Sequence, residues 1–204
     1  MIPAPLRGRY VGHLRVAHLG TPAEAEALLA PLRTVATPLV DTVRTMPVTE
    51  IGTIHADPVR PQPVSCGSAV LPRWDDAAVD VLLGAVGATR PHMLEIRHLG
   101  GALARPAAVD NAVGHRDARY NVFTSAYPGP GFHTAAELQT DLYRRLLPWS
   151  GGRALYNFSA RPDGQAADAR AAFDEVDFPR LRSVKTAWDP TNLCRFNVNI
   201  PPLS

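Results

Sequence analysis

The chain has 204 residues and a formal net charge of +2. Apolar residues make up 46% and charged residues 20% of it, proportions that are typical of a folded domain and argue against an intrinsically disordered chain. A run of about 18 apolar residues, which a membrane-spanning helix needs, does not occur. The first ten residues lack the apolar segment of a secretory signal, so we expect none.

The charge pattern argues against a nucleic-acid surface as the basis of function. Lys185 is the only lysine, and the arginines are scattered, often beside acids as in the run Arg73–Asp76. No basic stripe with interleaved aromatic residues occurs, so we expect no nucleic-acid partner. The two cysteines, Cys66 and Cys194, are too few for a disulfide framework and too far apart for a zinc motif. Two unpaired thiols predict a reducing, cytoplasmic location.

Periodicity and turn residues predict five strands and five helices. Segments rich in alternating, β-branched or aromatic residues predict strands at Arg9–Leu19, Ser65–Leu71, Met93–Leu99, Ala118–Tyr127 and Arg153–Ala160. Capping residues and apolar spacing predict helices from Thr21 to about Ala30, from Asp75 or Asp76 to about Val86, from Thr134 to about Leu147, and over Asp168–Phe173 and Phe178–Trp188.

Capping boxes support two of these helices. Thr21 is followed by Pro22 and Glu24, and Thr134 is followed by Glu137. Residues 37–65 contain several prolines and are expected to be irregular. In the C-terminal part, Asp189-Pro190 is expected to stop the last helix and to form a turn held by side-chain-to-backbone hydrogen bonds.

The order of these elements predicts an α+β fold, with a mostly antiparallel sheet and helices packed on one face. We expect a single domain over residues 1–204. No glycine-rich phosphate-binding motif of a dinucleotide fold or P-loop occurs, so the chain shows no nucleotide cradle of its own.

The titratable residues do not form a recognisable catalytic or metal motif. No two of the seven histidines have the helical spacing of a zinc site, and we expect no metal. Cys66 has neither a cationic neighbour nor a helix N-terminus beside it in the sequence, which favours a small buried cysteine over a reactive thiolate. No nucleophile elbow occurs either, so a hydrolase triad has little support.

Four segments carry a resemblance to a known family. The longest is Arg180–Pro202, which contains the pattern R-L-x-x-V-K-x-x-W-D-P-T-N-L-x-R-x-N-x-N-I-P-P. Ile96–Ala102, Ala112–Val122 and Asp41–Pro47 add shorter matches. Over essentially its whole length the sequence resembles the berberine bridge enzyme family of FAD-linked oxidoreductases.

The resemblance covers the substrate domain and, from about residue 150, the C-terminal berberine-like segment. Family members begin with a larger FAD-binding domain, which this sequence lacks. The resemblance therefore implies a truncated oxidoreductase component that binds FAD only if a separate flavin domain or subunit supplies it. The implied reaction is oxidation of a small organic alcohol, sugar or secondary-metabolite substrate by hydride transfer to flavin.

The resemblance also implies which residues face the substrate and the flavin. The positions of the family's catalytic bases are occupied by Phe158, Val122 and Thr124, none of which is a strong base, so the catalytic residue stays unassigned. Asn157 and Asn197 are implied to contact the cofactor. The residues implied to line the substrate site are Tyr120, Val122, Thr124, Tyr156 and Phe158.

Two alternatives remain open at this point. The chain could be a flavin-free protein that binds a small molecule, including a cyclase or isomerase that acts by positioning its substrate. It could also be a remnant without activity. The loss of the base positions and of the FAD-binding domain motivates both alternatives.

Overall fold

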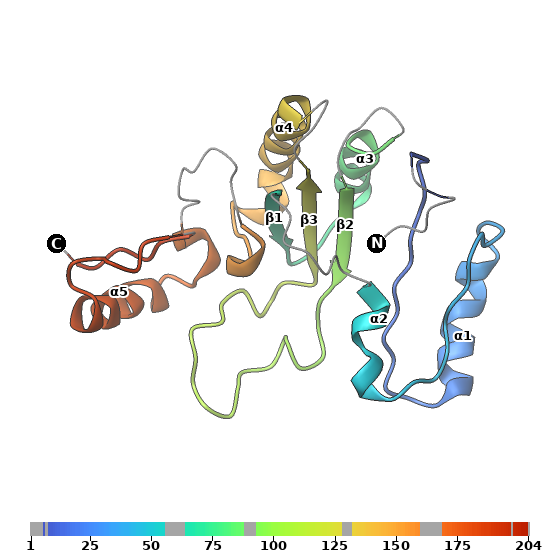
Figure 1. Cartoon of the computed structure of the whole chain (residues 1–204), viewed down its shortest axis with the longest axis horizontal. Coiled ribbons are helices and arrows are strands. Elements are labelled where there is room, and N and C mark those ends of the chain that lie inside the picture. Colours follow the sequence, from blue (N-terminus) through green and yellow to red (C-terminus); the bar gives the residue numbers. More distant parts are fainter. Residues whose placement is uncertain are drawn as a thin grey trace. The chain divides into compact units, whose positions relative to one another are not determined.

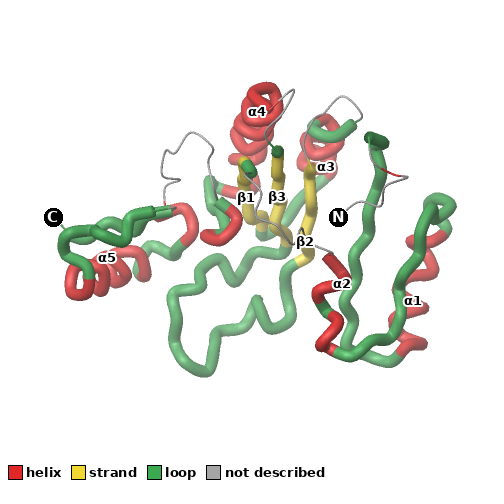
Figure 2. Tube along the Cα trace, in the orientation of Figure 1, coloured by secondary structure: helices red, strands yellow, loops and turns green. Residues whose placement is uncertain are grey.

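The computed structural model describes residues 6, 8–55, 64–87, 93–127, 132–159, 169–196 and 198–203. The chain divides into two compact units, residues 1–61 and 62–204, which are described separately below. Figure 1 labels their helices and strands, and Figure 2 shows how much of the chain is irregular.

The first unit is built around helix α1, Pro22–Arg33. The predicted capping box is confirmed, because the Thr21 side chain accepts from Glu24 N and the Glu24 carboxylate accepts from Thr21 N at 2.6 Å. The helix continues past Pro31, beyond the predicted end, since Arg33 in its last turn is held by Glu26 and Asp41. A short 3₁₀ helix, η2 (Val48–Glu50), and helix α2 (Gly52–His55) follow.

The predicted strand at Arg9–Leu19 is wrong. The described residues of this unit contain no strand, and Leu14 and Leu19 are exposed. Alternating residues favour an extended chain, but a strand also needs a neighbour to form its ladder of hydrogen bonds. Within the described part of the first unit no such neighbour is present.

The second unit contains a three-stranded antiparallel sheet in the order β1-β3-β2. Its strands are β1 (Ser65–Leu71), β2 (Met93–His98) and β3 (Tyr120–Ala126), close to the predicted bounds. The central strand β3 pairs with β1 through Ala69↔Val122 and with β2 through Ile96↔Val122. These pairings fix which residues of the three strands share a face.

Two helices, α3 (Asp76–Gly84) and α4 (Phe132–Ser150), lie side by side against the sheet (Figure 1). Asp75 caps α3 by accepting from Ala78 N, as predicted. The core between helices and sheet consists of Ala69, Leu71, Leu82, Val122, Leu142 and Leu146. The α+β class, with an antiparallel sheet and helices packed against it, is therefore confirmed.

Two local predictions fail in this unit. Helix α4 begins at Phe132, so Thr134 lies inside its first turn, and the predicted cap at Thr134 is wrong. The segment predicted as a strand at Arg153–Ala160 instead forms the 3₁₀ helix η3, Tyr156–Phe158. Before η3, the start of this segment pairs with the edge of β1, because Val70 N donates a hydrogen bond to Arg153 O at 3.0 Å. Leu155 N then donates to the Ser68 hydroxyl rather than to a carbonyl, so the ladder does not continue.

The C-terminal residues form a helix with the tail folded back along it. Helix α5 spans Asp177–Trp188, and the helix predicted before it is the 3₁₀ turn η4, Ala169–Ala172. Arg182 donates to the carbonyls of Pro201 and Pro202, which ties the tail to α5. A small apolar cluster fills the space beneath this segment, formed by Ala169, Phe173, Phe178, Val198 and Ile200.

The turn after α5 is organised by the carboxylate of Asp189, as the sequence predicts. Leu193 N and Cys194 N donate to it at 2.7 and 2.9 Å, and Lys185 Nζ lies 2.5 Å from Oδ2. The hydrogen bond from Lys185, followed by those from Cys194 N and Leu193 N, lowers the pKa of Asp189 to about 2. The negative charge of the ionised carboxylate strengthens each of these hydrogen bonds.

We expect the Asp189→Asn variant to loosen this turn and to make it insensitive to acid. The pKa of the folded carboxyl lies below its unfolded value, so the turn is fully stabilised above about pH 4 and loses that stabilisation as the pH falls toward 2. Hydrogen exchange at Leu193 N and Cys194 N measures the effect. Exchange should be faster in the variant at neutral pH, and equal protection in both proteins would contradict the prediction.

Candidate functional site

The pleat of the central strand β3 divides its side chains between two faces of the sheet. Val122 lies in the core with Leu142 and Leu146 of α4, and Thr124 Oγ1 shares a 2.7 Å hydrogen bond with Tyr143 OH of the same helix. Because successive strand residues point to opposite faces, Asn121, Phe123 and Ser125 lie on the face away from these helices.

The substrate residues implied by the resemblance are distributed over both faces. Val122 and Thr124 are fully buried under α4, and Tyr120 stacks between Trp74, at 3.9 Å between ring centroids, and His98, at 5.5 Å. Tyr156 and Phe158 lie on η3, where Phe158 contacts Phe123 on the opposite face. The structure thus brings Phe158 to Phe123 and does not bring it to Val122 or Thr124.

The face away from the helices carries a cluster of aromatic and charged side chains, which we call the Arg97 cluster: Glu95, Arg97, Phe123 and Phe158. The Arg97 guanidinium lies 4.4 Å from the centroid of Phe158 and 5.7 Å from that of Phe123. The two rings meet edge to face with centroids 5.3 Å apart. Glu95 forms an ion pair with Arg97, and their side chains are 16% and 31% exposed.

Sequence reasoning did not single out Glu95, Arg97 or Phe123. The signal that could have found them is the strand alternation itself. Residues 95 and 97 share a face of β2, and the antiparallel register pairs Glu95 with Phe123 and Arg97 with Asn121. The alternation divides the strand residues into two sets, one on each face of the sheet. The face that packs against the helices belongs to the core, and Glu95 and Arg97 lie on the other face.

Two buried polar atoms on the same face lack a partner among the described residues. Asn121 is fully buried, and its Oδ1 accepts from the Ser68 hydroxyl at 2.8 Å while its Nδ2 has no acceptor. Ser125 Oγ is likewise buried and unpaired there. Unsatisfied buried donors are costly in free energy, so this face retains unused capacity for hydrogen bonding.

Cys66 and Tyr143 lie near this sheet but do not supply reactive groups. Burial raises the pKa of the Cys66 thiol, which favours the neutral form rather than the thiolate. Burial also raises the pKa of Tyr143, whose hydroxyl is bonded to Thr124. Cys66 is therefore a partly buried residue of β1, and Tyr143 belongs to the packing between α4 and the sheet.

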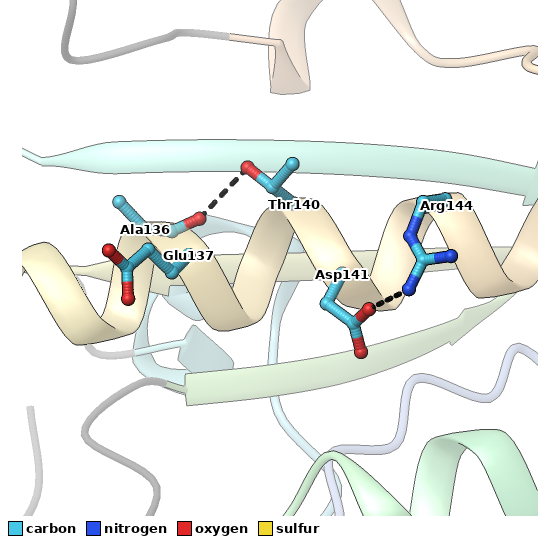
Figure 3. Close-up of a pocket in the computed structure, with 5 residues that line it drawn as sticks. All are labelled: Ala136, Glu137, Thr140, Asp141 and Arg144. Atoms are coloured by element: carbon cyan, nitrogen blue, oxygen red, sulfur yellow. Dashed lines mark hydrogen bonds and ion pairs between the residues drawn. The ribbon is translucent and has the colours of Figure 1, made fainter.

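A surface depression on α4 offers no alternative site (Figure 3). Thr140 donates to the Ala136 carbonyl within the helix, and Asp141 pairs with Arg144. The Asp141 and Arg144 side chains are 45% and 71% exposed, so their charges are screened by water. The depression therefore lacks the converging buried polar groups of a catalytic site.

The residues implied to contact a cofactor are only partly described. Asn157 is exposed on η3, and Asn197 lies outside the described residues. The glycine pairs Gly100–Gly101 and Gly151–Gly152 lead into irregular segments rather than into a helix, so neither forms the phosphate-binding turn of a dinucleotide fold. The described residues therefore form no cradle for the pyrophosphate of FAD.

The described part of the chain shows neither a cluster of metal ligands nor a candidate membrane span. No group of three or more His, Cys, Asp or Glu side chains gathers there in a way that could hold a metal ion. None of the described helices is both long and apolar enough to cross a bilayer.

Known proteins resemble this chain in one segment of its sequence and in its fold. Residues 161–201 match the family model "Berberine and berberine like", of which the structure describes residues 169–196 and 198–201. A search of curated protein sequences found no match.

Solved structures share the fold. The Physcomitrella patens BBE-like 1 structure superposes with a TM-score of 0.66 at 16% identity, over 86% of this chain and 41% of that one. Aclacinomycin oxidoreductase superposes with a TM-score of 0.65 at 20% identity, over 90% and 43%, and the structure titled FgChi7B with a TM-score of 0.64 at 15% identity, over 91% and 45%. The chain thus spans less than half the length of these structures, and at such identities the likeness establishes the fold.

The family match lies in the C-terminal segment, and the shared fold extends over 86–91% of the chain. Residues 161–201 are thus berberine-like in sequence, and the chain shares its fold with a BBE-like protein and with aclacinomycin oxidoreductase.

Proposed function

We propose that this chain is the substrate-binding part of an FAD-linked oxidoreductase and that the Arg97 cluster forms its substrate side. The supporting observation is the pairing of two aromatic rings with a guanidinium and a carboxylate on the face that the helices leave to other contacts. A small organic alcohol, sugar or secondary metabolite is the proposed substrate. The name of aclacinomycin oxidoreductase, a structural neighbour, supports the secondary-metabolite option for this chain.

The rings of Phe123 and Phe158 provide apolar surface for the carbon skeleton of such a substrate. The Arg97 fork donates hydrogen bonds to substrate oxygens. FAD, if held by a separate flavin-binding domain or subunit, would supply the hydride-accepting chemistry of such an oxidation. These residues bind and orient the substrate carbon for that transfer.

Oxidation of an alcohol also requires a group that accepts the hydroxyl proton. Glu95 is the only acidic residue in the three strands of the described sheet, and its register pairs it with Phe123. A carboxylate held by an arginine on this face has the chemistry of a general base. We therefore assign proton acceptance to Glu95 in place of the positions occupied by Phe158, Val122 and Thr124.

A flavin-free function is the second candidate. The family's base positions are occupied by side chains that cannot accept a proton, and two of them, Val122 and Thr124, are fully buried. Under this alternative the same Arg97 cluster binds a small molecule and positions it for cyclisation or isomerisation. The cytoplasmic location expected from the two unpaired thiols remains a prediction under both functions.

We expect the chain to be colourless alone and yellow with FAD and a co-expressed flavin-binding domain from a berberine-like relative. A visible absorbance scan of the copurified proteins measures this, with the flavin domain alone as the control. Co-elution of flavin absorbance with this chain supports the oxidoreductase. Absence of this chain from the flavin-containing fraction contradicts it and favours the flavin-free alternative.

A further inference from the structure

The side chain of Arg97 is held in place at the centre of the Arg97 cluster. Its Nε donates a hydrogen bond to the carboxylate of Glu95, which also forms the ion pair. The guanidinium lies 4.4 Å from the ring centroid of Phe158 and 5.7 Å from that of Phe123. A free arginine side chain samples many rotamers, and these contacts restrict that freedom. The guanidinium is therefore pre-organised before any molecule binds to it.

The second edge of this guanidinium has no acceptor in the described part of the chain. A guanidinium carries its N–H donors in a planar fork, and Glu95 engages Nε. None of the described residues accepts a hydrogen bond from Nη1 or Nη2 of Arg97, although the side chain is only 31% exposed. The N–H groups of this edge are therefore available to a bound molecule.

Arg153, in the same unit, shows how a fully engaged arginine differs from Arg97. Its Nη1 lies 2.9 and 3.0 Å from the two carboxylate oxygens of Asp117, and its Nε donates to Ser150 O. The side chain of Arg153 is 30% exposed, almost the same fraction as that of Arg97. The degree of burial therefore does not account for the unused edge of Arg97.

We infer that this edge of Arg97 binds a carboxylate. The substrate is then an alcohol that also carries a carboxylate on an apolar or aromatic framework, an assignment that deepens the proposed function and rests on it. A carboxylate matches the arginine fork with two parallel N–H···O bonds, and such charge-assisted bonds are about twice as strong as neutral ones. A neutral hydroxyl or amide oxygen occupies only part of the same edge.

The neighbouring side chains suit the rest of such a molecule. Phe123 and Phe158 are half-buried and meet edge to face with centroids 5.3 Å apart. Their apolar surface adjoins the guanidinium, so the carboxylate and the carbon framework of one small molecule can contact the cluster together. The positive charge of Arg97 lies between Glu95 and the bound carboxylate and offsets their repulsion. A substrate hydroxyl close to that carboxylate then comes next to Glu95, the proposed proton acceptor.

The test uses the full chain without flavin, with benzoate as the probe and benzamide as its neutral analogue of similar shape. NMR titrations at constant ionic strength measure the dissociation constant of each compound. We expect benzoate to bind about tenfold more tightly, with the largest shifts at the backbone amides of residues 95–97, 123 and 158. Equal affinities, shifts confined to other residues, or no binding of benzoate would each overturn the inference.

Three variants locate the preference for benzoate. Arg97→Gln should bind the two compounds equally, and Arg97→Lys, which keeps the charge without the fork, should lose most of the preference. Arg144→Gln removes the same charge from an exposed position on α4, the helix on the other face of the sheet, and should keep the preference. A preference that survives in Arg97→Gln overturns the inference. The comparison of the two compounds in the wild-type chain does not depend on whether the variants fold.

Separate measurements distinguish failure of this inference from failure of the proposed function. A chain that co-elutes with flavin but binds benzoate no better than benzamide retains the oxidoreductase function and overturns the carboxylate site. A chain that prefers benzoate through Arg97 but does not co-elute with flavin retains the carboxylate site and contradicts the oxidoreductase.

Discussion

The Glu95→Gln variant of the flavin-reconstituted protein should lose about a hundredfold or more in kcat, within the range typical of a removed general base. Gln has nearly the same size as Glu and keeps an acceptor toward Arg97, but it cannot take the hydroxyl proton. The Arg97 cluster therefore keeps its shape while the proton acceptor is lost. Steady-state turnover with the flavin band monitored in parallel measures the effect.

The Arg97→Gln variant separates catalysis from the ion pair. It breaks the same Glu95–Arg97 contact but leaves the carboxylate in place. We expect Arg97→Gln to raise KM with a much smaller change in kcat, because Arg97 binds substrate oxygens rather than the transferred proton. Equal losses of kcat in both variants would assign the effect to the broken ion pair and remove Glu95 from its proposed role.

The Gly67→Ala variant should lower the free energy of unfolding by about 3 kcal/mol, combining overpacking with a lost buried hydrogen bond. A Cβ at residue 67 would lie 2.2 Å from Cε2 of Tyr143. The Tyr143 ring is packed against the core and bonded to Thr124, so it cannot move without losing that bond. The midpoint of urea unfolding measures the change.

Gly84→Ala is the matched control for this prediction. A Cβ at Gly84, the last residue of α3, meets its nearest described neighbour, Arg145 Nη1, at an ordinary 3.8 Å. Alanine has the higher helix propensity, so this variant should be as stable as the wild type or slightly more stable. Equal stability of Gly67→Ala and Gly84→Ala would show that the Tyr143 ring yields freely and would contradict the prediction.

Local sequence signals predicted those elements whose determinants are themselves local. Thr21 and Asp75 cap their helices through residues three positions away, and Asp189 organises a turn within five residues. The three strands of the sheet were predicted because their composition and flanking turn residues identify them. The C-terminal pattern around Trp188–Asn192 carried the family resemblance, which the family match over residues 161–201 confirms.

The segment before Ala160 shows where local signals stop. Its residues favour a strand, and Arg153 does pair with β1. Whether the pairing continues depends on Ser68, a residue 87 positions away from Leu155, whose hydroxyl takes the next backbone N–H. The sequence of the segment alone therefore does not predict whether Leu155 N bonds to a backbone carbonyl or to the distant Ser68 hydroxyl.

For the candidate site, the sequence predicts the strand, but only the tertiary structure shows which of its faces is exposed. The sequence by itself determined that residues 120–126 form a strand and that its side chains alternate between two sets. Only the packing of α4 decided that Val122 and Thr124 belong to the core, since Leu142 and Leu146 cover that face and Gly67 leaves room for the ring of Tyr143. The set Asn121, Phe123 and Ser125 thereby faces Arg97 and η3. The two-residue alternation of a strand does not say which of its two faces is buried. Packing against a helix that is distant in sequence decides it.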